Sequence, residues 1–431
     1  MQHEAQAWRS TLERMTTTRK AHRSSAARKT RPRLALALAG GGPLGAIYEI
    51  GALCALDDSL QGIDFNACDH YVGVSAGGFI AAGLANGLTP RQLCEAFIED
   101  RPTDENFDTA WLIKPAWAEL GGRIQRLPGL LGSALWAWAA QGKPLTQALE
   151  RLGAALPTGV FDNEDIHRQV ERLFSREGRS NDFRQLRARL TLVATELDTG
   201  DAAPFGRPGW DHVPISRAIQ ASAALPGLFP PVVIDGKHYV DGALKKTLHA
   251  TVALDEGVDL LICLNPLVPF RAGPHAEPAA SGQQRIPSLI EGGLPTVMSQ
   301  TFRSMIHSRL ELGFKQYERS YPDTDIVLIE PDQRDAELFF ANTFSYRQRR
   351  ELAEHAYQQT RQMLRDRQAQ LAPKLQRHGI RIDQAALDDT GRHLLRPVSP
   401  AADRPTTRAV ERLHATLDQL QQQLSRRPAR A

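Results

Sequence analysis

Ser75 stands in a setting that can turn a hydroxyl into a nucleophile. It lies in the run Gly73-Val74-Ser75-Ala76-Gly77, which has the G-x-S-x-G pattern. In this pattern a strand meets a helix through a turn so sharp that only small side chains fit around the serine. The hydroxyl then projects above the sheet at the positive end of the helix. A structural turn serine would also fit the five residues alone, but the position between a strand and a helix favours a nucleophile.

A glycine-rich loop about thirty residues upstream can serve the same chemistry. Gly40-Gly41-Gly42-Pro43-Leu44-Gly45 also fits the G-x-G-x-x-G spacing of a dinucleotide-binding loop. That site needs an acidic residue at the end of the next strand, whereas Asp64 and Asp69 precede it. We therefore expect backbone N–H groups, uncrowded by Cβ atoms, to face the oxyanion of a tetrahedral intermediate. The candidate oxyanion-hole residues are Gly40, Gly41, Gly42 and Gly45.

The serine needs a base, and Asp241 is the strongest candidate. It follows a predicted strand and is followed by Gly242 and Ala243, which are small enough for another backbone to approach. A carboxylate acts as a general base when burial raises its pKa and it reaches the serine. The other Asp-Gly pair, Asp235-Gly236, separates two short strands as a type I′ hairpin does. A Ser-His-Asp triad would need one of the downstream histidines, which are His212, His238, His249 and later ones.

Together these motifs resemble the patatin-like phospholipase family. The loop Gly40–Gly45, the elbow Gly73–Gly77 and Asp241-Gly242-Ala243 match the three signatures of that family in order and spacing, within residues 34–250. Further matches are Ala194–Gly200 and Ala221–Pro226, the latter followed by Phe229-Pro230. The resemblance implies a Ser75–Asp241 dyad that uses no histidine. It also implies hydrolysis of lipid acyl esters without a metal or cofactor.

Leu44 departs from the family, which usually has arginine or lysine at this position. Backbone N–H donors do not depend on that side chain, so the oxyanion hole is expected to remain. Leucine cannot, however, supply a cationic contact to the acyl carbonyl or to a phosphate head group, so no such contact is expected at this position. Two alternatives therefore stay open beside the Ser-Asp hydrolase. One is a Ser-His-Asp esterase of the α/β-hydrolase type, and the other is a non-catalytic lipid-binding or scaffolding protein with the same fold.

The elements that must position these residues follow a strand–helix–strand–helix order. We expect strands at Leu34–Ala39 and His70–Val74 and helices at Gly45–Leu56 and from Ser75 to Asn86-Gly87. Alternation of this kind predicts an α/β fold with helices on both faces of a mostly parallel sheet. The family resemblance likewise implies three α/β/α layers. Later expected strands are Leu190–Glu196, Val232–Ile234, Lys237–Val240, Leu260–Asn265 and Ile326–Ile329, and later helices are Thr296–Tyr317 and Tyr346–Gln370.

A helical insertion is expected after the elbow, at about residues 90–180. It holds four of the six tryptophans, between Trp111 and Trp138, and Leu127–Ala140 carries no charge. Tryptophan favours the boundary between apolar and aqueous surroundings, so a lid or an acyl-binding surface fits this segment. Ordinary packing between helices fits it equally well, and both interpretations stay open.

The net charge of +3 conceals an uneven distribution. Residues 1–33 carry +7 and residues 347–431 carry +8, which leaves −12 for residues 34–346. We therefore divide the chain into a basic N-terminal arm (1–33), a catalytic domain (34–346, with its motifs in 34–250) and a basic, mainly helical extension (347–431). Solvated ends are the favoured interpretation of the arms. Attachment to anionic membrane is a second hypothesis, and nucleic-acid binding is not expected.

No segment has the length of a membrane-spanning helix, and the apolar run Leu34–Ala39 is too short for a secretory signal. We expect a cytoplasmic protein, and contact with a membrane through the basic arms and the Trp111–Trp138 region is a hypothesis. The four cysteines, Cys54, Cys68, Cys94 and Cys263, show no C-x-x-C spacing, so buried thiols are expected rather than a zinc site or a redox pair. The oligomeric state does not follow from these patterns.

Overall fold

An eight-stranded sheet organises the structure, a computed structural model that describes residues 31–99, 158–271, 289–339 and 346–395. The strand order is β6-β7-β4-β3-β1-β8-β9, and β5 pairs with β4. The five strands from β9 to β4 run parallel, whereas β5, β6 and β7 are added in antiparallel fashion. The strands are β1 (Leu34–Leu38), β3 (His70–Gly73), β4 (Arg189–Glu196), β5 (Ala202–Phe205), β6 (Val232–Ile234), β7 (Lys237–Asp241), β8 (Leu260–Leu264) and β9 (Asp325–Ile329).

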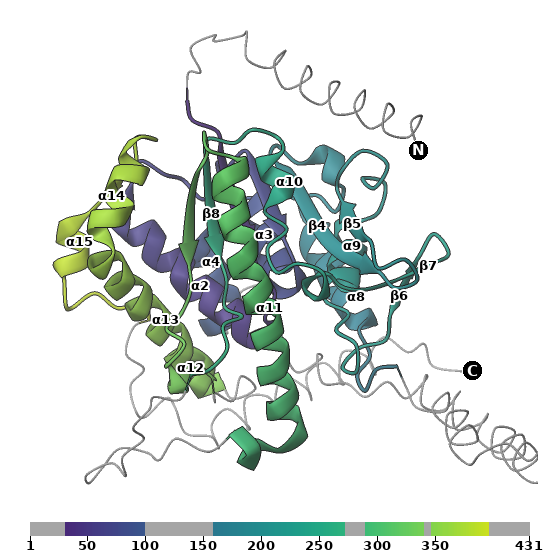
Figure 1. Cartoon of the computed structure of the whole chain (residues 1–431). Helices are drawn as coiled ribbons and strands as arrows, with labels where there is room; N and C mark the ends of the chain where they lie inside the picture. The colour runs from purple at the N-terminus through teal and green to yellow at the C-terminus, as the bar shows by residue number, and fades with distance from the viewer. Residues whose placement is uncertain (1–30, 100–157, 272–288, 340–345, 396–431) are drawn as a thin grey trace, which may run out of the picture.

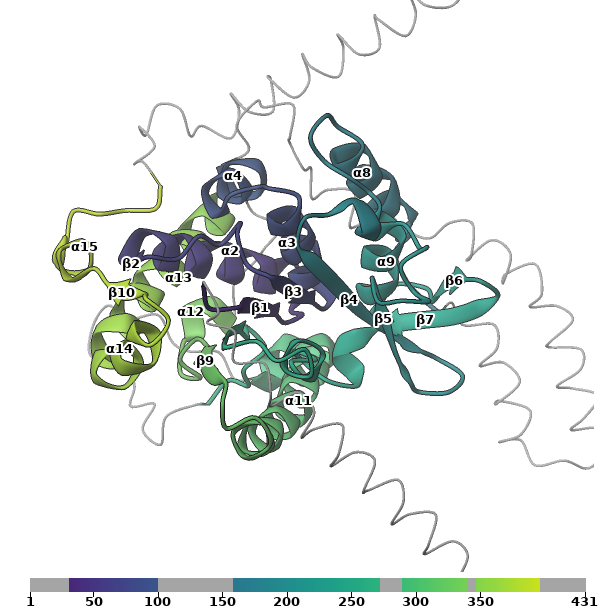
Figure 2. The same cartoon turned by 90° about the horizontal axis from the view of Figure 1, so that it is seen from above.

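Helices cover both faces of this sheet, as Figures 1 and 2 show. Successive side chains of a strand point to opposite faces. Accordingly, Leu36 and Leu38 of β1 join the larger core with residues of α2, α3 and α13. Ala35 and Ala37 join the core on the other face, with residues of α10 and α11. Burial on both faces explains why β1 is apolar throughout, and the predicted three-layer α/β/α fold is confirmed.

The helices on the first face are α2 (Gly42–Ser59), α3 (Ser75–Ala85), α4 (Pro90–Cys94), α8 (Glu164–Phe174), α9 (Ile215–Ser222) and α13 (Tyr346–Asp366). Helix α2 is buried on most of its surface because it lies between the sheet and α13. A Cβ atom on Gly51 of α2 would lie 2.5 Å from the carbonyl oxygen of Ala353 in α13. The two helix backbones thus approach as closely as a glycine allows.

The remaining described helices are α10 (Thr251–Leu254), α11 (Gly293–Ser320), α12 (Ala336–Phe339), α14 (Gln368–Gln376) and α15 (Gln384–Asp388). A second small sheet pairs β2 (Leu60–Gln61) with β10 (Arg381–Ile382). Leu352, Tyr357, Leu371 and Leu387 belong to the same core as α2. The part of the basic C-terminal segment up to residue 395 therefore packs against the body of the molecule.

Most predicted strands and helices are present, and the differences have local causes. Helix α2 begins at Gly42 rather than Gly45, because Gly41 caps it and a proline occupies the first turn. The single helix predicted for residues 346–370 is wrong, since Arg367 has non-helical dihedral angles and separates α13 from α14. The prediction also omitted β5, which contains Pro204, and helix α9.

Two smaller predictions are confirmed. Asp235 and Gly236 both have positive φ angles, 50° and 76°, and join β6 to β7 as a type I′ turn does. The four cysteines are buried and form no disulfide. Within the described residues, no helix is long and apolar enough to cross a membrane.

Parts of the predicted insertion and of both arms fall outside the described residues. Of the insertion, the structure describes residues 90–99, with α4 and the π-helix Glu95–Glu99, and residues 158–180, with α8. The tryptophan-rich segment Trp111–Trp138 lies outside the described residues, as do residues 1–30 and 396–431.

Candidate active site

Ser75 occupies a strained position at the junction of β3 and α3. Val74 still has extended dihedral angles, whereas Ser75, the first residue of α3, has a φ angle of 53°. A residue with a side chain adopts this left-handed conformation at a cost of about 1–3 kcal/mol, and such strain is concentrated at functional sites. The side chain is 6% exposed. The sharp turn that the G-x-S-x-G pattern predicts is therefore present.

The two glycines of the elbow allow the backbone to fold this tightly. A Cβ atom on Gly73 would lie 2.4 Å from the Cα of Gly78 in the first turn of α3. One on Gly77 would lie 2.3 Å from the carbonyl oxygen of Ala39. That oxygen accepts a hydrogen bond from the N–H of Gly77 at 3.1 Å. The elbow is thereby joined directly to the start of the glycine-rich loop.

The glycine-rich loop passes beside the Ser75 hydroxyl. A Cβ atom on Gly40 would lie 3.0 Å from the Cβ and 3.6 Å from the Oγ of Ser75. Gly41 and Gly42 have φ angles of 151° and 58°, which favour glycine. At Gly42 the direction of a side chain is open, with no atom within 4 Å. Gly45 lies in the first turn of α2, where its N–H donates to the carbonyl of Gly41 at 3.0 Å.

Asp241 reaches the same point from the other half of the sheet. It is the last residue of β7, and its backbone N–H donates to the carbonyl of Ala224 at 3.0 Å. One carboxylate oxygen, Oδ1, accepts a hydrogen bond of 2.8 Å from the N–H of Ala243. The Ser75 side chain lies near enough to this carboxyl group to lower its pKa. A Cβ atom on Gly40 would lie 3.0 Å from the Cβ of Ser75 and 3.5 Å from that of Ala243, so the candidate nucleophile and the candidate base lie beside the same glycine.

Burial sets the electrostatics of Asp241, which is 3% exposed. Loss of hydration raises the pKa of this carboxyl group to about 6, and the hydrogen bond from Ala243 and the nearby Ser75 side chain oppose that rise. The Asp241 carboxylate is therefore a better proton acceptor than an exposed one and is still ionised at neutral pH. The neighbouring Gly242 packs against β4, since a Cβ atom there would lie 2.1 Å from the carbonyl oxygen of Val193.

The three histidines considered as alternative bases have other partners. His212 pairs with Asp235 at 2.8 Å in the exposed β6–β7 turn. His238 lies 3.8 Å from the carboxylate of Asp198. His249 is buried, and its Nε2 lies 3.2 Å from the carbonyl oxygen of Gly242. Burial lowers the pKa of His249 to about 4, so this ring is neutral and supports the turn that follows Asp241.

Ser222, the last residue of α9, holds the elbow from behind, and the sequence assigned it no role. The backbone N–H of Ser75 donates to the Oγ of Ser222 at 2.8 Å, and that hydroxyl donates to the carbonyl of Val193 at 2.7 Å. Ser222, which is 147 residues from Ser75 in the sequence, therefore links the candidate nucleophile to β4. The sequence did point to this region, because the run Ala221–Pro226, which contains Ser222, matches a family motif.

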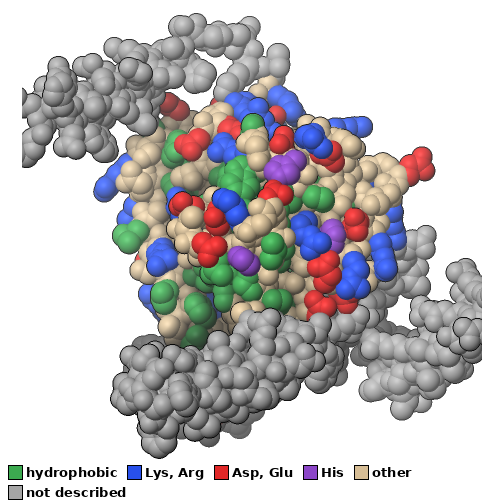
Figure 3. Space-filling view, turned by 90° about the vertical axis from the view of Figure 1, so that its right-hand side faces the viewer, with side chains coloured by type: hydrophobic (Ala, Val, Ile, Leu, Met, Phe, Trp, Pro, Cys, Tyr) green, Lys and Arg blue, Asp and Glu red, His purple; other side chains and the backbone are tan. Residues whose placement is uncertain are grey.

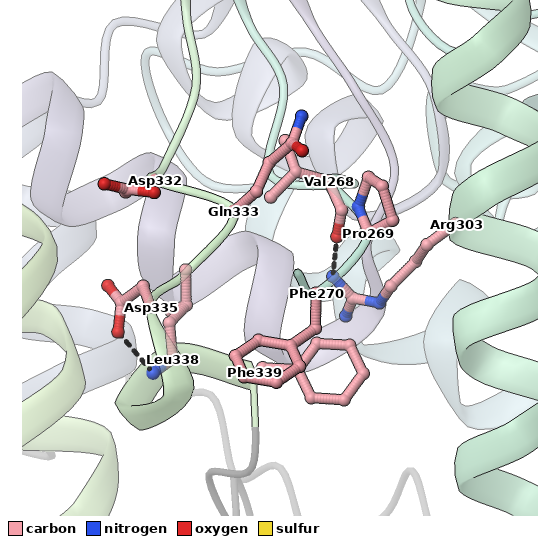
Figure 4. Close-up of a pocket in the computed structure, with 9 residues that line it drawn as sticks. All are labelled: Val268, Pro269, Phe270, Arg303, Asp332, Gln333, Asp335, Leu338 and Phe339. Atoms are coloured by element: carbon pink, nitrogen blue, oxygen red, sulfur yellow. Dashed lines mark hydrogen bonds between the residues drawn. The ribbon is translucent and has the colours of Figure 1, made fainter. Parts of the chain in front are cut away.

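The loop after β8 supports the glycine-rich loop from the other side. Cβ atoms on Gly41 and Gly45 would each lie 3.1 Å from the Cγ of Pro266. The guanidinium group of Arg303 in α11 donates to the carbonyls of Pro266 and Val268 at 3.4 and 3.3 Å. Figure 4 shows Arg303 reaching Val268 beside a cavity of about 10 Å³, enough for about one water molecule. Arg303 thus stabilises the loop on which the glycines rest.

Among the described residues, no group of three or more His, Cys, Asp or Glu side chains could hold a metal ion. The arrangement at Ser75 consists of a hydroxyl, a carboxylate and a turn of glycine backbone, which is a set of groups suited to acyl transfer.

A comparison with known protein families identifies the family of this chain. The family model described as patatin-like phospholipase matches residues 36–254, just over half of the chain. The chain belongs to the patatin-like phospholipase family. The matched region begins in β1, ends in α10 and contains both Ser75 and Asp241. The family resemblance inferred from the motifs is confirmed.

Solved structures that are similar to this chain include those of VipD and ExoU. VipD from Legionella pneumophila is 16% identical, with 78% of this chain and 67% of VipD covered and a TM-score of 0.35. The type III effector ExoU is 15% identical, with 78% and 53% covered and a TM-score of 0.32. ExoU of Pseudomonas aeruginosa in its complex with SpcU is 16% identical, with 76% of this chain and 53% of that chain covered and a TM-score of 0.27. This chain spans about half to two thirds of the length of these proteins, and the family assignment rests on the family model.

Proposed function

We propose that this chain hydrolyses the carboxylic acyl esters of lipids, with Ser75 as the nucleophile and Asp241 as the general base. The observation that carries the proposal is that these two buried residues come together beside the glycine-rich loop, with Ser75 at a strained strand–helix turn. Membership of the patatin-like phospholipase family supports an acyl ester of a lipid as the substrate.

In the first step Asp241 removes the hydroxyl proton while the Ser75 oxygen attacks the ester carbonyl carbon. The electron pair of the carbonyl moves to its oxygen, and the tetrahedral intermediate forms. When it collapses, the alcohol leaves with the proton held by Asp241, and an acyl-serine remains. In the second step Asp241 removes a proton from water while the water oxygen attacks the acyl carbonyl carbon. When this second intermediate collapses, the bond to the Ser75 oxygen breaks and that oxygen takes the proton from Asp241. The products are a fatty acid and the regenerated serine, so the reaction needs no oxidant or cofactor.

The backbone N–H groups of Gly40, Gly41 and Gly42 are the proposed oxyanion donors. The N–H of Gly45, the fourth candidate from the sequence, already donates to the carbonyl of Gly41 and is left out. Their support comes from the position of the loop, which passes within van der Waals distance of Ser75, and from the open space at Gly42. Removal of one such donor typically lowers kcat by about 100–1,000-fold. Because Leu44 carries no charge, head-group recognition by a cation at this position is not part of the proposal.

The proposal is tested with purified full-length protein on p-nitrophenyl esters of increasing chain length and on phosphatidylcholine. We expect Ser75→Ala and Asp241→Asn each to lower kcat/KM by at least 100-fold while the circular dichroism spectrum is retained. Asp235→Asn is the matched control for the aspartate, because Asp235 also precedes a glycine but lies in the exposed hairpin turn. Ser308→Ala, an exposed serine in α11, is the control for the nucleophile.

Three outcomes would contradict the proposal. Full activity of either dyad variant would exclude the dyad. Loss of activity in His212→Ala or His238→Ala would favour a histidine-dependent esterase. A wild-type chain inactive on all these esters would favour a lipid-binding protein that has the fold without the activity.

A further inference from the structure

Helix α11 extends well beyond the sheet that it covers. Its 28 residues span about 42 Å, whereas a five-residue strand spans about 17 Å. The second half is packed, since Leu310 and Tyr317 lie in the core with β1 and β8. Figure 1 shows the first half projecting below the body. One end of α11 is therefore free of the sheet.

Two side chains fix the orientation of the projecting half. Gln300 pairs with the backbone of Phe270 through both amide atoms, at 3.0 and 2.8 Å, and Arg303 binds the carbonyls of Pro266 and Val268. At 100° per residue, Gln300 and Arg303 lie on the same side of the helix as Leu310. The opposite side faces away from the body.

That outward side is apolar. Leu294, Met298, Phe302 and Met305 recur at the spacing of one helix face, and all are exposed. Two residues near the tip are the most exposed large hydrophobic side chains of the described residues, Ile290 at 79% and Leu294 at 73%. Such a row on a projecting helix indicates a surface that contacts another apolar phase.

Between Glu291 and Arg303 the same stretch carries no charge. From Gly292 to Phe302 the sequence contains no Asp, Glu, Lys or Arg, and its polar side chains are Thr, Ser and Gln. Beyond Met305 the outward side changes to Arg309, Gln316 and Arg319, with Leu312 as an isolated apolar residue. The apolar character is thus confined to the part of α11 that projects.

The projecting half lies at the same edge of the sheet as the candidate dyad. Strands β1, β3 and β8 are parallel, so Gly40, Ser75 and the loop held by Arg303 all follow carboxyl ends at one edge. Figure 3 shows hydrophobic side chains gathered in the lower half of the adjacent face, at the end of the molecule to which α11 projects in Figure 1.

We propose that the first half of α11 inserts into the lipid surface that carries the substrate, an inference that rests on the proposed function. A lipid interface accepts apolar side chains together with Ser, Thr and Gln and needs no matching charges. Because the stretch is uncharged, binding should occur on zwitterionic lipid and resist salt. Attachment through the basic arms would instead require anionic lipid and weaken as salt screens the charges.

The test is co-sedimentation of the full chain with phosphatidylcholine vesicles. We expect Leu294→Glu/Met298→Glu to lower the partition coefficient at least tenfold. The matched control is Leu312→Glu/Gln316→Glu, which also places two glutamates one turn apart on the same side of α11, but in its packed half, and should bind as the wild type does. Raising NaCl from about 0.1 to 0.5 M should change wild-type binding less than twofold.

Activity gives a second readout. In Leu294→Glu/Met298→Glu the ratio of vesicle phosphatidylcholine hydrolysis to p-nitrophenyl acetate hydrolysis should fall at least tenfold. Unchanged vesicle binding of this variant, or an equal loss in Leu312→Glu/Gln316→Glu, would overturn the proposal. The proposal would also be overturned if the wild type bound no vesicles and formed a dimer in light scattering, while Leu294→Glu/Met298→Glu was a monomer. A second copy of the chain would then occupy this face. Inactivity on every ester with intact vesicle binding would overturn only the proposed hydrolysis.

Discussion

The burial of Asp241 predicts that the candidate base destabilises the folded chain at neutral pH. A carboxyl group whose pKa is higher in the folded state binds its proton more tightly there than in the unfolded state. The folded state therefore loses stability as pH rises from the ordinary value of about 3.8 to the folded value of about 6. Asparagine at this position has no charge to bury. We predict that Asp241→Asn is more stable than the wild type at neutral pH and inactive.

The magnitude follows from the shift. A rise of about two pKa units corresponds to about 3 kcal/mol at pH 8, of which about 1 kcal/mol is already present at pH 4.5. The stability advantage of Asp241→Asn should therefore grow by about 2 kcal/mol between pH 4.5 and 8. The asparagine side chain of this variant would keep an oxygen acceptor for the N–H of Ala243, so this contact need not be lost.

The assay is urea denaturation of the wild type and the variant across this pH range, with the free energy of unfolding compared at each pH. Asp235→Asn serves as the control, because its side chain is 66% exposed and burial does not act on it. A difference that does not change with pH, or an Asp241→Asn variant less stable than the wild type at pH 8, would refute the reasoning.

Three further predictions test other parts of the site. Gly40→Ala should lower kcat at least 100-fold, because the new Cβ atom would lie 3.0 Å from the Cβ of Ser75. In Gly42→Ala the new side chain would point into open space, so this variant should mainly lose about 1–2 kcal/mol of stability because of the φ angle of 58°. Enzyme kinetics measures the first effect and urea denaturation the second. Ser222→Ala should cost about 1–3 kcal/mol, because the buried N–H of Ser75 loses its acceptor, and equal stability in urea would count against this support. The kcat/KM of the wild type should fall tenfold per pH unit below about pH 6 as Asp241 becomes protonated, and a profile flat down to pH 4.5 would argue against Asp241 as the base.

The local geometry of the site could be predicted from the sequence. Residues 73 and 77 must be glycines because other backbone atoms lie within 2.5 Å of the positions that their Cβ atoms would occupy. The motif itself therefore specifies the elbow. The different roles of Asp235 and Asp241 could also be predicted from the sequence. Asp235 lies between two short strands, as a turn residue does, whereas Asp241 lies at the end of a strand.

The supports of the site could not be predicted in this way. Ser222 acts on Ser75 only because α9 packs beneath the elbow, and Pro266 contacts the glycine-rich loop only because β8 pairs with β1. These contacts depend on strand order, which no local pattern encodes. The projecting half of α11 was hidden for the same reason, since its composition resembles that of an ordinary amphipathic helix until the length of the neighbouring strands is known.

Covalent labelling is the most direct test of the central claim that Asp241, without a histidine, activates Ser75. The full chain is treated with a fluorophosphonate at pH 7.5, and intact-mass and peptide mass spectrometry give the rate and the site of modification. We predict one adduct on Ser75, formed at wild-type rate in His212→Ala, His238→Ala and His249→Gln. Asp241→Asn should form it at least 100-fold more slowly. An adduct on another residue, or a rate that depends on one of these histidines and not on Asp241, would contradict the account.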